Sequence, residues 1–457
     1  MIHRLKSTGS IVAVAAIAFV GSFQVRIASQ TTSGARDPGP RGGAPGAGDP
    51  LPGLTPAQAE YFQVGLEDFS AAEEPADGLG PRMNLDSCVG CHLQPAAGGS
   101  SPAVNPQVAF AAASRDALPP FITPNGPARE ARFVANPDGT PDGGVHALFT
   151  LSGRVGADGC TLEQPDFAAQ LARHNVIFRI PTPTFGLGLV EQIPDAAIAQ
   201  NQAANSAAKA SLGIRGRPNF HVAGRTITGQ TNNNGNDGTI ARFGWKAQNK
   251  SLLMFAGEAY NVEMGITNEL FMTERDEVAA CQSTGTPNSI SNLDEADATD
   301  VMSSIDKFAL FMRLLAPPAP SPDTPGGATS IARGRQVFTS TGCALCHNPS
   351  FKTGASKVAA LSNKSVNLFS DLLLHDMGVG LADGVSQGEA GPREFRTAPL
   401  WGLGQRLFFL HDGRTSNLMT AIRAHQSSGS EANGVVSRFL GLSEAQKQDV
   451  LNFLRSL

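Results

Sequence analysis

The sequence predicts a mainly helical fold of two similar domains, the first of which is enlarged by β-rich insertions and long loops. The pattern C-x-x-C-H occurs once in each half of the chain, at Cys88–His92 and at Cys343–His347. Each half also ends in a helical pattern of apolar residues. Between the halves, the stretch P-P-A-P-S-P-D-T-P-G-G at 317–327 favours neither helix nor strand, and we place the domain boundary there.

The composition is typical of a globular protein with long irregular segments. The chain has 457 residues, of which 41% are hydrophobic and 16% are charged, so it can bury a sizeable core. The 50 glycines and 31 prolines predict long loops between short elements. The net charge of −5 argues against a nucleic-acid-binding protein, because such proteins usually carry a basic surface stripe.

Residues 1–29 are predicted to be a signal peptide or an N-terminal anchor. A basic start precedes an apolar run from Ile11 to Phe23, which is shorter than the roughly 20 residues of a membrane span. The small-residue cleavage sites V-G-S and I-A-S are imperfect, so an uncleaved membrane tether stays open. A Pro/Gly-rich linker follows at 30–53. Export predicts an oxidising compartment, and we expect the periplasm.

The two C-x-x-C-H motifs predict attachment sites for c-type heme. Cysteines three positions apart lie about one helical turn apart, so both sulfurs can bind one porphyrin edge while the next histidine binds the iron. A thioredoxin-like motif would need a βαβ context, and a zinc site would need four ligands close together. We therefore expect two cytochrome c-like heme domains with two covalent hemes. The predicted attachment and ligand residues are Cys88, Cys91, His92, Cys343, Cys346 and His347.

The first heme domain is predicted at 54–316. It begins with L-T-P-A-Q-A-E-Y-F-Q-V-G-L-E-D-F, which has a Thr cap and apolar residues at helical spacing. Residues on both sides of an Asn-Pro-Asp-Gly turn predict strands at 131–140 and 145–154, and 219–230 resembles another strand. The apolar run at 303–315 predicts a buried helix before the boundary.

The second heme domain is predicted at 328–457. A helix over 330–338 precedes its heme motif, and the chain closes with a helix over 442–457. Ser443 and Gln446 form a capping-box pattern at the start of that last helix.

Seven stretches in order resemble the di-heme oxidoreductase family, whose members are described as peroxidases or thiol oxidoreductases and are related to bacterial di-heme cytochrome c peroxidases and to MauG. The resemblance runs from Leu54 to the end of the chain. The stretches are G-L-G-P-R-M-N-L-D-S-C-V-G-C-H, R-I-P-T-P-T-F-G-L-G-L-V-E-Q-I-P-D, R-F-G-W-K-A-Q-N-K-S-L, M-G-I-T-N-E-L-F, S-D-L-L-L-H-D-M-G-V-G-L-A-D, F-R-T-A-P-L-W-G-L-G and F-L-H-D-G-R.

The resemblance implies that the two hemes have different tasks. In the related peroxidases the C-terminal heme collects electrons and the N-terminal heme meets peroxide, which makes His92 the ligand of the reactive heme. The distal-loop histidine of those peroxidases has no clear counterpart after His92. The sixth position of the first iron is therefore left as open, or as filled by one of His146, His174, His221 and Met264.

Four further residues stand in the matching stretches. The resemblance places His411 of H-D-G against a heme. We interpret His375 as a contact of the heme edge or of a propionate, with a plain turn as the alternative. Trp245 and Trp401, the only tryptophans, are candidates for an electron relay between the hemes and equally for ordinary core residues.

His425 is the predicted second axial ligand of the C-terminal heme. N-L-M-T-A-I-R-A-H reads as a helix whose apolar face holds Leu418, Ala421, Ile422 and His425, while Met419 falls off that face. A buried imidazole needs a partner, and an iron would supply one. The resemblance agrees, because the helix after H-D-G carries the sixth ligand in the related peroxidases. The alternative is a core histidine bonded to the backbone.

Cys160 and Cys281 are the two cysteines outside the heme motifs. Export favours their oxidation to a disulfide, which we predict, and two separate buried thiols are the alternative. The bond would close a loop of about 120 residues.

We expect an exported di-heme c-type oxidoreductase that reduces hydrogen peroxide with electrons entering at the C-terminal heme. No dinucleotide fingerprint or phosphate loop is visible, so the expected donor is a small protein of the cytochrome or cupredoxin type. The alternatives are an electron-transfer cytochrome without peroxidase activity, a MauG-like oxidant of a partner protein, and a heme-bearing accessory of metal uptake. The physiological substrate, the identity of the donor, the oligomeric state and any bound calcium stay open.

Overall fold

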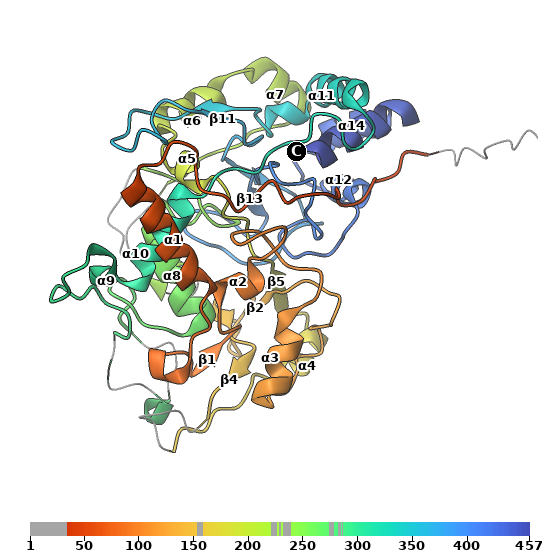
Figure 1. Ribbon diagram of the computed structural model, residues 1–457. Helices are drawn as coiled ribbons and strands as arrows, with labels where there is room; N and C mark the ends of the chain where they lie inside the picture. The colour runs from red at the N-terminus through yellow and green to blue at the C-terminus, as the bar shows by residue number, and fades with distance from the viewer. Residues whose placement is uncertain are drawn as a thin grey trace, which may run out of the picture. The chain divides into compact units, whose positions relative to one another are not determined.

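The fold is mainly helical, as the sequence predicts, with only small sheets (Figure 1). The structure is a computed structural model that describes residues 34–152, 159–220, 226–227, 230–231, 239–273, 278–281, 285 and 287–457. From Ala35 onward these residues form one compact unit. Within the described residues no helix is long and apolar enough to cross a membrane, and the predicted signal or anchor at 1–29 lies outside them.

Within the described ranges, the chain forms α-helices and three short 3-10 turns. The helices are α1 (Pro56–Ser70), α2 (Cys88–Cys91), α3 (Pro106–Ser114), α4 (Phe167–Ala172), α5 (Leu187–Glu191), α6 (Asp195–Ala203), α7 (Ser206–Leu212), α8 (Leu252–Met264), α9 (Ala298–Val301), α10 (Ser304–Leu314), α11 (Ala328–Thr341), α12 (Leu418–Ala424), α13 (Asn433–Leu440) and α14 (Glu444–Ser456). The 3-10 turns are η1 (Pro75–Asp77), η2 (Ala279–Cys281) and η3 (Cys343–Leu345).

The strands of the described residues are short, and each pairs with antiparallel neighbours. They are β1 (Arg82–Met83), β2 (Glu130–Phe133), β3 (Val145–His146), β4 (Phe149–Thr150), β5 (Val176–Arg179), β6 (Asn219–Phe220), β7 (Thr226–Ile227), β8 (Gln230–Thr231), β9 (Ile240–Ala241), β10 (Phe351–Lys352), β11 (Ser365–Val366), β12 (Leu374–Asp376) and β13 (Glu394–Arg396). The described pairs are β1-β4, β6-β9, β7-β8, β10-β11 and β12-β13, and β3-β2-β5 form a three-stranded sheet.

The predicted strands around the Asn-Pro-Asp-Gly turn belong to that three-stranded sheet. Ala131 pairs with His146 on one side of β2 and with Phe178 on the other. The first strand begins one residue earlier than predicted, and the second is divided into β3 and β4. Much of the strand predicted at 219–230 lies outside the described residues.

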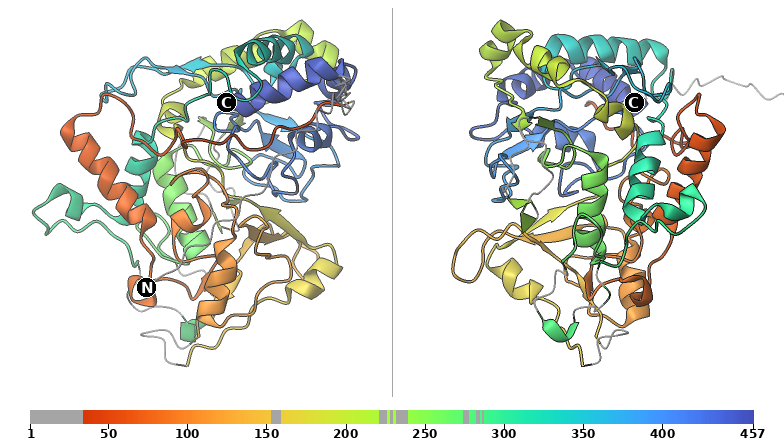
Figure 2. Two further views of the ribbon diagram at one scale, coloured as in Figure 1. Left: turned by 45° about the vertical axis from the view of Figure 1, so that its right-hand side comes forward. Right: turned by 90° about the vertical axis from the view of Figure 1, so that its left-hand side faces the viewer.

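Helices α1, α8 and α10 pack side by side in the first half of the chain (Figure 2). The predicted Thr cap of α1 is confirmed, because the Thr55 side chain accepts a hydrogen bond from Gln58 N and the Gln58 side-chain oxygen accepts one from Thr55 N. Gly65 lets α1 approach α10 closely: an added Cβ would lie 2.4 Å from the carbonyl oxygen of Lys307. The predicted buried helix at 303–315 is α10.

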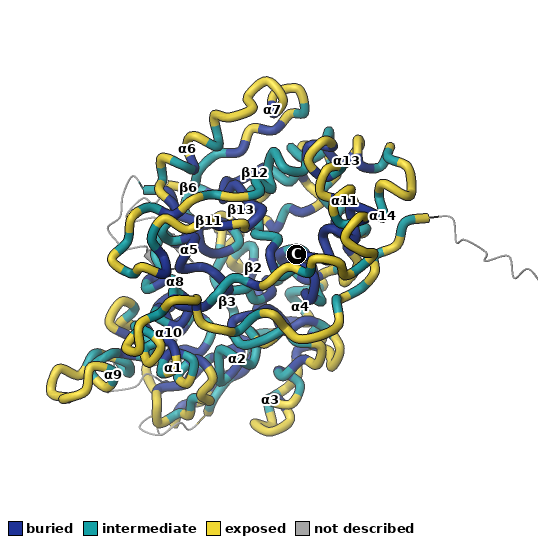
Figure 3. Tube along the Cα trace, turned by 45° about the horizontal axis from the view of Figure 1, so that its top comes forward, coloured by how far each residue is buried: buried dark blue, intermediate teal, exposed yellow. Residues whose placement is uncertain are grey.

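Helices α11 and α14 cross closely in the C-terminal half, where an added Cβ on Gly334 would lie 1.9 Å from the carbonyl oxygen of Asp449. The predicted capping box of Ser443 and Gln446 starts α14. These helices bury their own apolar cluster, which includes Phe338, Phe369, Phe439 and Phe453. Figure 3 shows β12 among the most buried elements, while α7 is mostly exposed.

The larger apolar cluster joins the two predicted domains. It is centred on α1, α8 and α10 and also contains Leu361, Leu373 and Trp401 from the C-terminal half. The segment 317–327 connects α10 to α11, as expected of a linker. Since both halves lie in one compact unit, their division into two heme domains stays a prediction.

Residues 35–49, which we call the N-terminal strap, lie within the predicted Pro/Gly-rich linker and bind the C-terminal half. Asp37 accepts hydrogen bonds at 2.8 Å from Nε and Nη2 of Arg455, and both side chains are almost fully buried. Arg41 N donates to the carbonyl of Gly404 at 2.6 Å. A segment rich in proline and glycine adds little to an apolar core. This segment is instead bound to the C-terminal half by hydrogen bonds of its backbone and by the carboxylate of Asp37.

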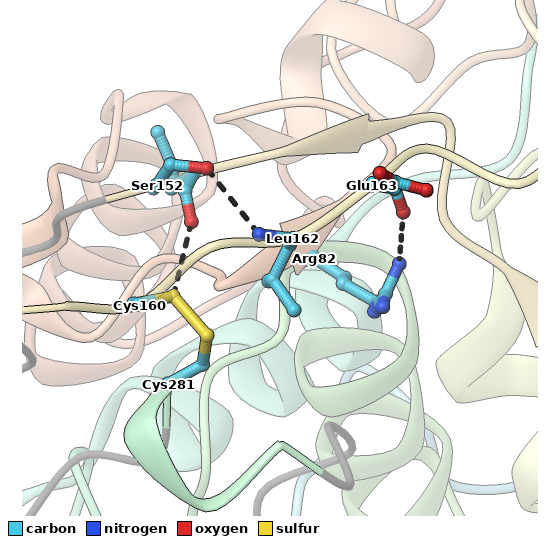
Figure 4. Close-up of a disulfide and its surroundings, with 7 residues drawn as sticks. Arg82, Ser152, Cys160, Leu162, Glu163 and Cys281 are labelled. Atoms are coloured by element: carbon cyan, nitrogen blue, oxygen red, sulfur yellow. Dashed lines mark hydrogen bonds between the residues drawn. A yellow bond between two sulfur atoms is a disulfide. The ribbon is translucent and has the colours of Figure 1, made fainter.

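The predicted disulfide between Cys160 and Cys281 is confirmed and joins residues 121 positions apart (Figure 4). Both cysteines are buried and pack with Leu162. Next to the bond, Arg82 Nη1 donates to the carbonyl oxygen of Glu163 at 3.0 Å. The disulfide therefore ties the loop after β4 to the short turn η2.

Candidate heme sites

Both C-x-x-C-H motifs fold into a single tight turn. The first forms α2, and the second forms the 3-10 turn η3. In each, the amide of the histidine donates to the carbonyl of the first cysteine at 2.9 Å, from His92 to Cys88 and from His347 to Cys343. The same local geometry in both halves places two sulfurs and one imidazole on the wall of a cavity.

We name the two cavities by the motif that each contains. The N-terminal cavity is lined by residues including Cys88, Cys91, His92, Glu130, Trp245 and Met264. The C-terminal cavity is lined by residues including Cys343, Cys346, His347, Trp245, His411 and His425.

Three cysteines in these walls, Cys88, Cys91 and Cys343, are neutral as free thiols. Burial raises the pKa of Cys88 and of Cys343 to about 12, and it also raises the pKa of Cys91. Zinc binding and thiol–disulfide exchange both use thiolates, which this environment disfavours. An uncharged thioether suits the same environment, so the residues fit covalent heme attachment better than a metal-thiolate or redox site.

Three histidines present the same face to the cavities. Nδ1 of His92 lies 3.0 Å from the carbonyl oxygen of Gly99, and Nδ1 of His347 lies 3.0 Å from that of Phe369. Nδ1 of His425 lies 2.7 Å from the carbonyl oxygen of Ala421. A carbonyl oxygen only accepts, so Nδ1 carries the proton in each ring and Nε2 keeps its lone pair, which is the arrangement of a metal-ligating histidine.

Burial keeps these imidazoles neutral. It lowers the pKa of His92 and of His347 to about 4, which the backbone carbonyls facing each ring only partly offset. Burial lowers the pKa of His425 as well. The neutral form is the one that binds a metal. His425 also lowers the pKa of His347, and both rings line the C-terminal cavity.

Two buried arginines give the C-terminal cavity positive charge without a carboxylate partner among the described residues. Burial lowers the pKa of Arg396 and of Arg406 to about 10, and the charge of Arg406 adds to the lowering at Arg396. The Nη2 atom of Arg406 is buried without a hydrogen-bond partner in the described structure. Buried charge needs compensation. The propionates of a heme would supply the missing negative charge, so this donor set fits the group.

The N-terminal cavity has a wall of charged groups that sequence reasoning missed. Glu130 is bonded to Nε of Arg132 at 2.6 Å and forms a second side-chain hydrogen bond with Glu263. Burial alone would raise the pKa of Glu130, but Arg132 and Glu263 outweigh it and lower the pKa. A hydrogen bond between two carboxyl groups requires a proton on one of them, and the lowered pKa of Glu130 favours the ionised form of that residue. The alternation E-A-R in β2 was the available signal, because it places Glu130 and Arg132 on one face of a strand.

The four candidates for the sixth ligand of the first iron lie in different places. Met264 lines the N-terminal cavity. His146 does not line it, and its Nε2 lies 2.9 Å from a carboxylate oxygen of Asp142. His174 is exposed and also lies outside the lining. His221 lies outside the described residues.

Trp245 is the residue common to the linings of both cavities, whereas Trp401 lines neither. The indole nitrogen of Trp245 donates to the carbonyl of Ile180 at 2.9 Å. The rings of Trp245 and His411 lie in an edge-to-face arrangement, with 6.5 Å between their centroids. Trp401 belongs to the larger apolar core and packs against the backbone of Gly186, where an added Cβ would lie 2.8 Å from the indole.

His375 is held by two carboxylates beside the second motif. Its Nε2 lies 3.0 Å from Asp371 and its Nδ1 lies 2.8 Å from Glu431, while the sulfur of Cys346 is 3.8 Å away. Burial alone would lower the pKa of His375, but the Cys346 sulfur and Asp371 raise it well above its usual value. A thioether sulfur carries no charge, so in a heme-bearing protein the two carboxylates remain to stabilise the imidazolium. His375 and His411 both line the C-terminal cavity.

Comparison with known proteins yields one family. The sequence profile described as "Di-haem oxidoreductase, putative peroxidase" matches residues 134–457, which is more than half of the chain. No curated protein matches this chain. Among solved structures, the hydrazine synthase of Kuenenia stuttgartiensis pressurised with xenon is 18% identical over 35% of this chain and 56% of that chain, with a TM-score of 0.23. This chain thus spans about half of the synthase chain, and so low a TM-score supports no structural conclusion.

Proposed function

The chain belongs to the di-haem oxidoreductase family, and from this premise we propose that it is an exported c-type di-heme enzyme that reduces hydrogen peroxide to water. One observation carries the proposal. Three half-buried, neutral histidines bond their Nδ1 atoms to backbone carbonyls and line two cavities, each of which also contains a C-x-x-C pair. A bound heme supplies an iron that exchanges single electrons and, where one axial position is free, binds a small oxidant.

The two cavities differ in a way that supports a division of labour. Of the four histidines that line the C-terminal cavity, His347 and His425 bond their Nδ1 atoms to backbone carbonyls, so both would be free to bind an iron through Nε2. The N-terminal cavity has His92 as its one described histidine and a wall of buried acidic and basic side chains. We therefore assign electron entry to the C-terminal site and peroxide reduction to the N-terminal site.

The reduction of one hydrogen peroxide to two waters consumes two electrons and two protons. We assign the proton of the Glu130–Glu263 hydrogen bond to Glu263, because Arg132 favours the ionised form of Glu130. The pair can thus deliver a proton from Glu263 and regain one from solvent while staying buried. A positioned acid of this kind contributes about 10²–10⁴-fold to a reaction rate.

Trp245 offers a path for electrons between the sites. Its ring belongs to both linings, and its indole N–H is fixed to Ile180, whose own amide donates to the carbonyl of His411 at 2.8 Å. These hydrogen bonds fix the ring in the shared wall.

The expected partner is a small electron-donor protein of the cytochrome or cupredoxin type, and the expected compartment is the periplasm. The disulfide between Cys160 and Cys281 supports an oxidising location. The acidic net charge of −5 gives no support to a nucleic-acid partner.

Peroxide consumption with a reducing dye as donor tests the proposal. The wild-type protein should turn over, His92→Ala should abolish turnover, and the C-terminal heme should keep its absorption spectrum in that variant. An electron-transfer cytochrome would show two six-coordinate irons and no turnover, which would refute the proposal. A MauG-like oxidant would form a long-lived oxidised state without the dye, and that result would refute it as well.

A further inference from the structure

Three buried charged side chains meet beside Trp245. Nζ of Lys246 lies 3.2 Å from Oδ1 of Asp383, and Arg179 forms an ion pair with the other carboxylate oxygen. The side chains of Lys246, Asp383 and Arg179 are 0%, 1% and 4% exposed. Arg179 also lines the N-terminal cavity, and Trp245 lines both cavities. The cluster therefore lies in the wall between the two cavities.

The ammonium of Lys246 is enclosed by groups from the C-terminal half. It donates to the carbonyl oxygens of Gly391 at 2.9 Å and Glu394 at 3.0 Å. It also lies 4.1 Å from the ring centroid of Phe395, which stacks on His411 at 4.3 Å. Both rings line the C-terminal cavity, so the charge of Lys246 acts on that site through one aromatic layer.

The turn that carries Trp245 is fixed from several sides. Arg396 N donates to the Trp245 carbonyl at 2.9 Å, and the Arg396 side chain donates to Gly244 O at 2.9 Å. The amide of Asn219 donates to the carbonyls of Lys246 at 2.9 Å and Ala247 at 3.0 Å. The side chain of Lys246 adds the bonds to β13 and Asp383, so the residue next to Trp245 anchors the turn to the C-terminal half.

We propose that Lys246 positions Trp245 between the two sites and binds or releases a proton as the C-terminal heme is reduced or oxidised. Reduction of that heme by one electron from the donor favours uptake of one proton from solvent at Nζ. Loss of the electron through Trp245 to the N-terminal site favours release of that proton to solvent. The inference rests on the proposed function, since it requires a heme in the C-terminal cavity.

The surroundings allow this proton exchange near neutral pH. Burial lowers the pKa of Lys246 to about 7; Asp383 partly offsets this effect, and the charge of Arg179 adds to it. Glu394 also faces the ammonium, but its carboxylate is bonded to Nε of Arg217 at 2.7 Å. His411 stays neutral, because burial and nearby cations, Lys246 among them, lower its pKa well below the usual value. Lys246 is therefore the group of this cluster that changes charge in the neutral range.

Spectroelectrochemistry of the holoprotein tests the inference. The reduction potential of the C-terminal heme is measured from about pH 5.5 to about pH 8.5, on both sides of the Lys246 pKa. In wild type it should fall as the pH rises, because a positive charge favours the reduced heme and is lost on deprotonation. Lys246→Met should hold the potential near the high-pH wild-type value, and Lys246→Arg should hold it near the low-pH value, both without the transition.

The exposed Lys352 provides a matched control, since Lys352→Met removes one surface charge and should behave as wild type. If the methionine variant does not fold, the arginine variant decides alone. A wild-type potential that is independent of pH, or a transition that persists in either Lys246 variant, overturns the inference. Peroxide turnover in a protein without the transition would leave the proposed function intact, whereas the transition without turnover would refute that function and leave this inference standing.

Discussion

Glu263 is the residue to which we assign the proton of its hydrogen bond with Glu130, because Arg132 favours the ionised form of Glu130. Glu263→Gln keeps the shape of the side chain but removes the acid. We predict a fall in peroxide turnover of about 10²–10⁴-fold, with unchanged heme content. Steady-state kinetics measure the change, and the exposed Glu60→Gln serves as a control. Turnover within about twofold of wild type would remove Glu263 from the reaction.

Trp245 and Trp401 form a natural pair for testing the path between the sites. Trp245→Phe should slow electron transfer from the C-terminal to the N-terminal heme by about tenfold or more, since it shortens the ring that both cavities share. Trp401→Phe changes a core tryptophan that lines neither cavity and should leave the rate unchanged. Flash reduction followed by stopped-flow absorbance measures both rates. Equal rates in the two variants would contradict a role for Trp245.

At the scale of elements, the N-terminal strap is held by one buried ion pair. Removing one partner of such a pair leaves a buried, unpaired charge, so Asp37→Ala should lower the free energy of unfolding by about 3–5 kcal/mol. The partly exposed pair of Asp68 and Lys307 provides a control, and Asp68→Ala should cost about 1 kcal/mol or less. Urea unfolding of the holoprotein measures both. A loss for Asp37→Ala no larger than for Asp68→Ala would mean that the strap is not fastened by this pair.

The same pair predicts a pH dependence. Burial alone would raise the pKa of Asp37, but Arg455 and two backbone amides outweigh it and hold the pKa below its ordinary value of 3.8. A carboxyl group whose pKa is lower in the folded protein than in the unfolded protein stabilises the fold at pH values above its unfolded-state pKa. This stabilisation is lost as the pH falls through the folded-state pKa. Wild type should therefore lose stability more steeply below pH 3.8 than Asp37→Asn does. Parallel stability curves for the two proteins would contradict this.

The disulfide joins the loop after β4 to the turn η2. Closing a loop between residues 121 apart contributes about 4–5 kcal/mol in the chain-entropy view. The double variant Cys160→Ser and Cys281→Ser should lose stability on that order while keeping both hemes. Thermal unfolding without reductant measures the loss, and thiol labelling of denatured wild type should find both cysteines blocked. Labelled thiols at both positions would contradict the bond.

At the scale of the whole molecule, local sequence patterns predicted those parts of the fold that depend on neighbours in the chain. The Thr55 and Ser443 capping boxes, the helix with His425 at its end and the two heme motifs each involve residues within one or two turns. The disulfide followed from the number of cysteines and the expected compartment. Short-range chemistry suffices for such features.

Long-range pairings could not be predicted from one sequence. Lys246 and Asp383 are far apart in the chain, and both would ordinarily be assigned to the surface, yet they are buried together. Arg406 carries no local signal for its place in the C-terminal cavity. The proline and glycine content of the N-terminal strap predicted a linker. No pattern in the sequence indicated that the carboxylate of Asp37 in this segment forms a buried ion pair with Arg455. Each of these positions is decided by tertiary contacts.

The proposed division of labour requires that two hemes in one molecule act on one peroxide. Anaerobic titration of the fully reduced protein with hydrogen peroxide, followed by absorbance at both hemes, measures this stoichiometry. We predict that one equivalent of peroxide oxidises both hemes, because each peroxide accepts two electrons, and that His92→Ala leaves the C-terminal heme reduced. Failure of peroxide to oxidise either heme in wild type, or rapid oxidation of the C-terminal heme in His92→Ala, would contradict the proposal.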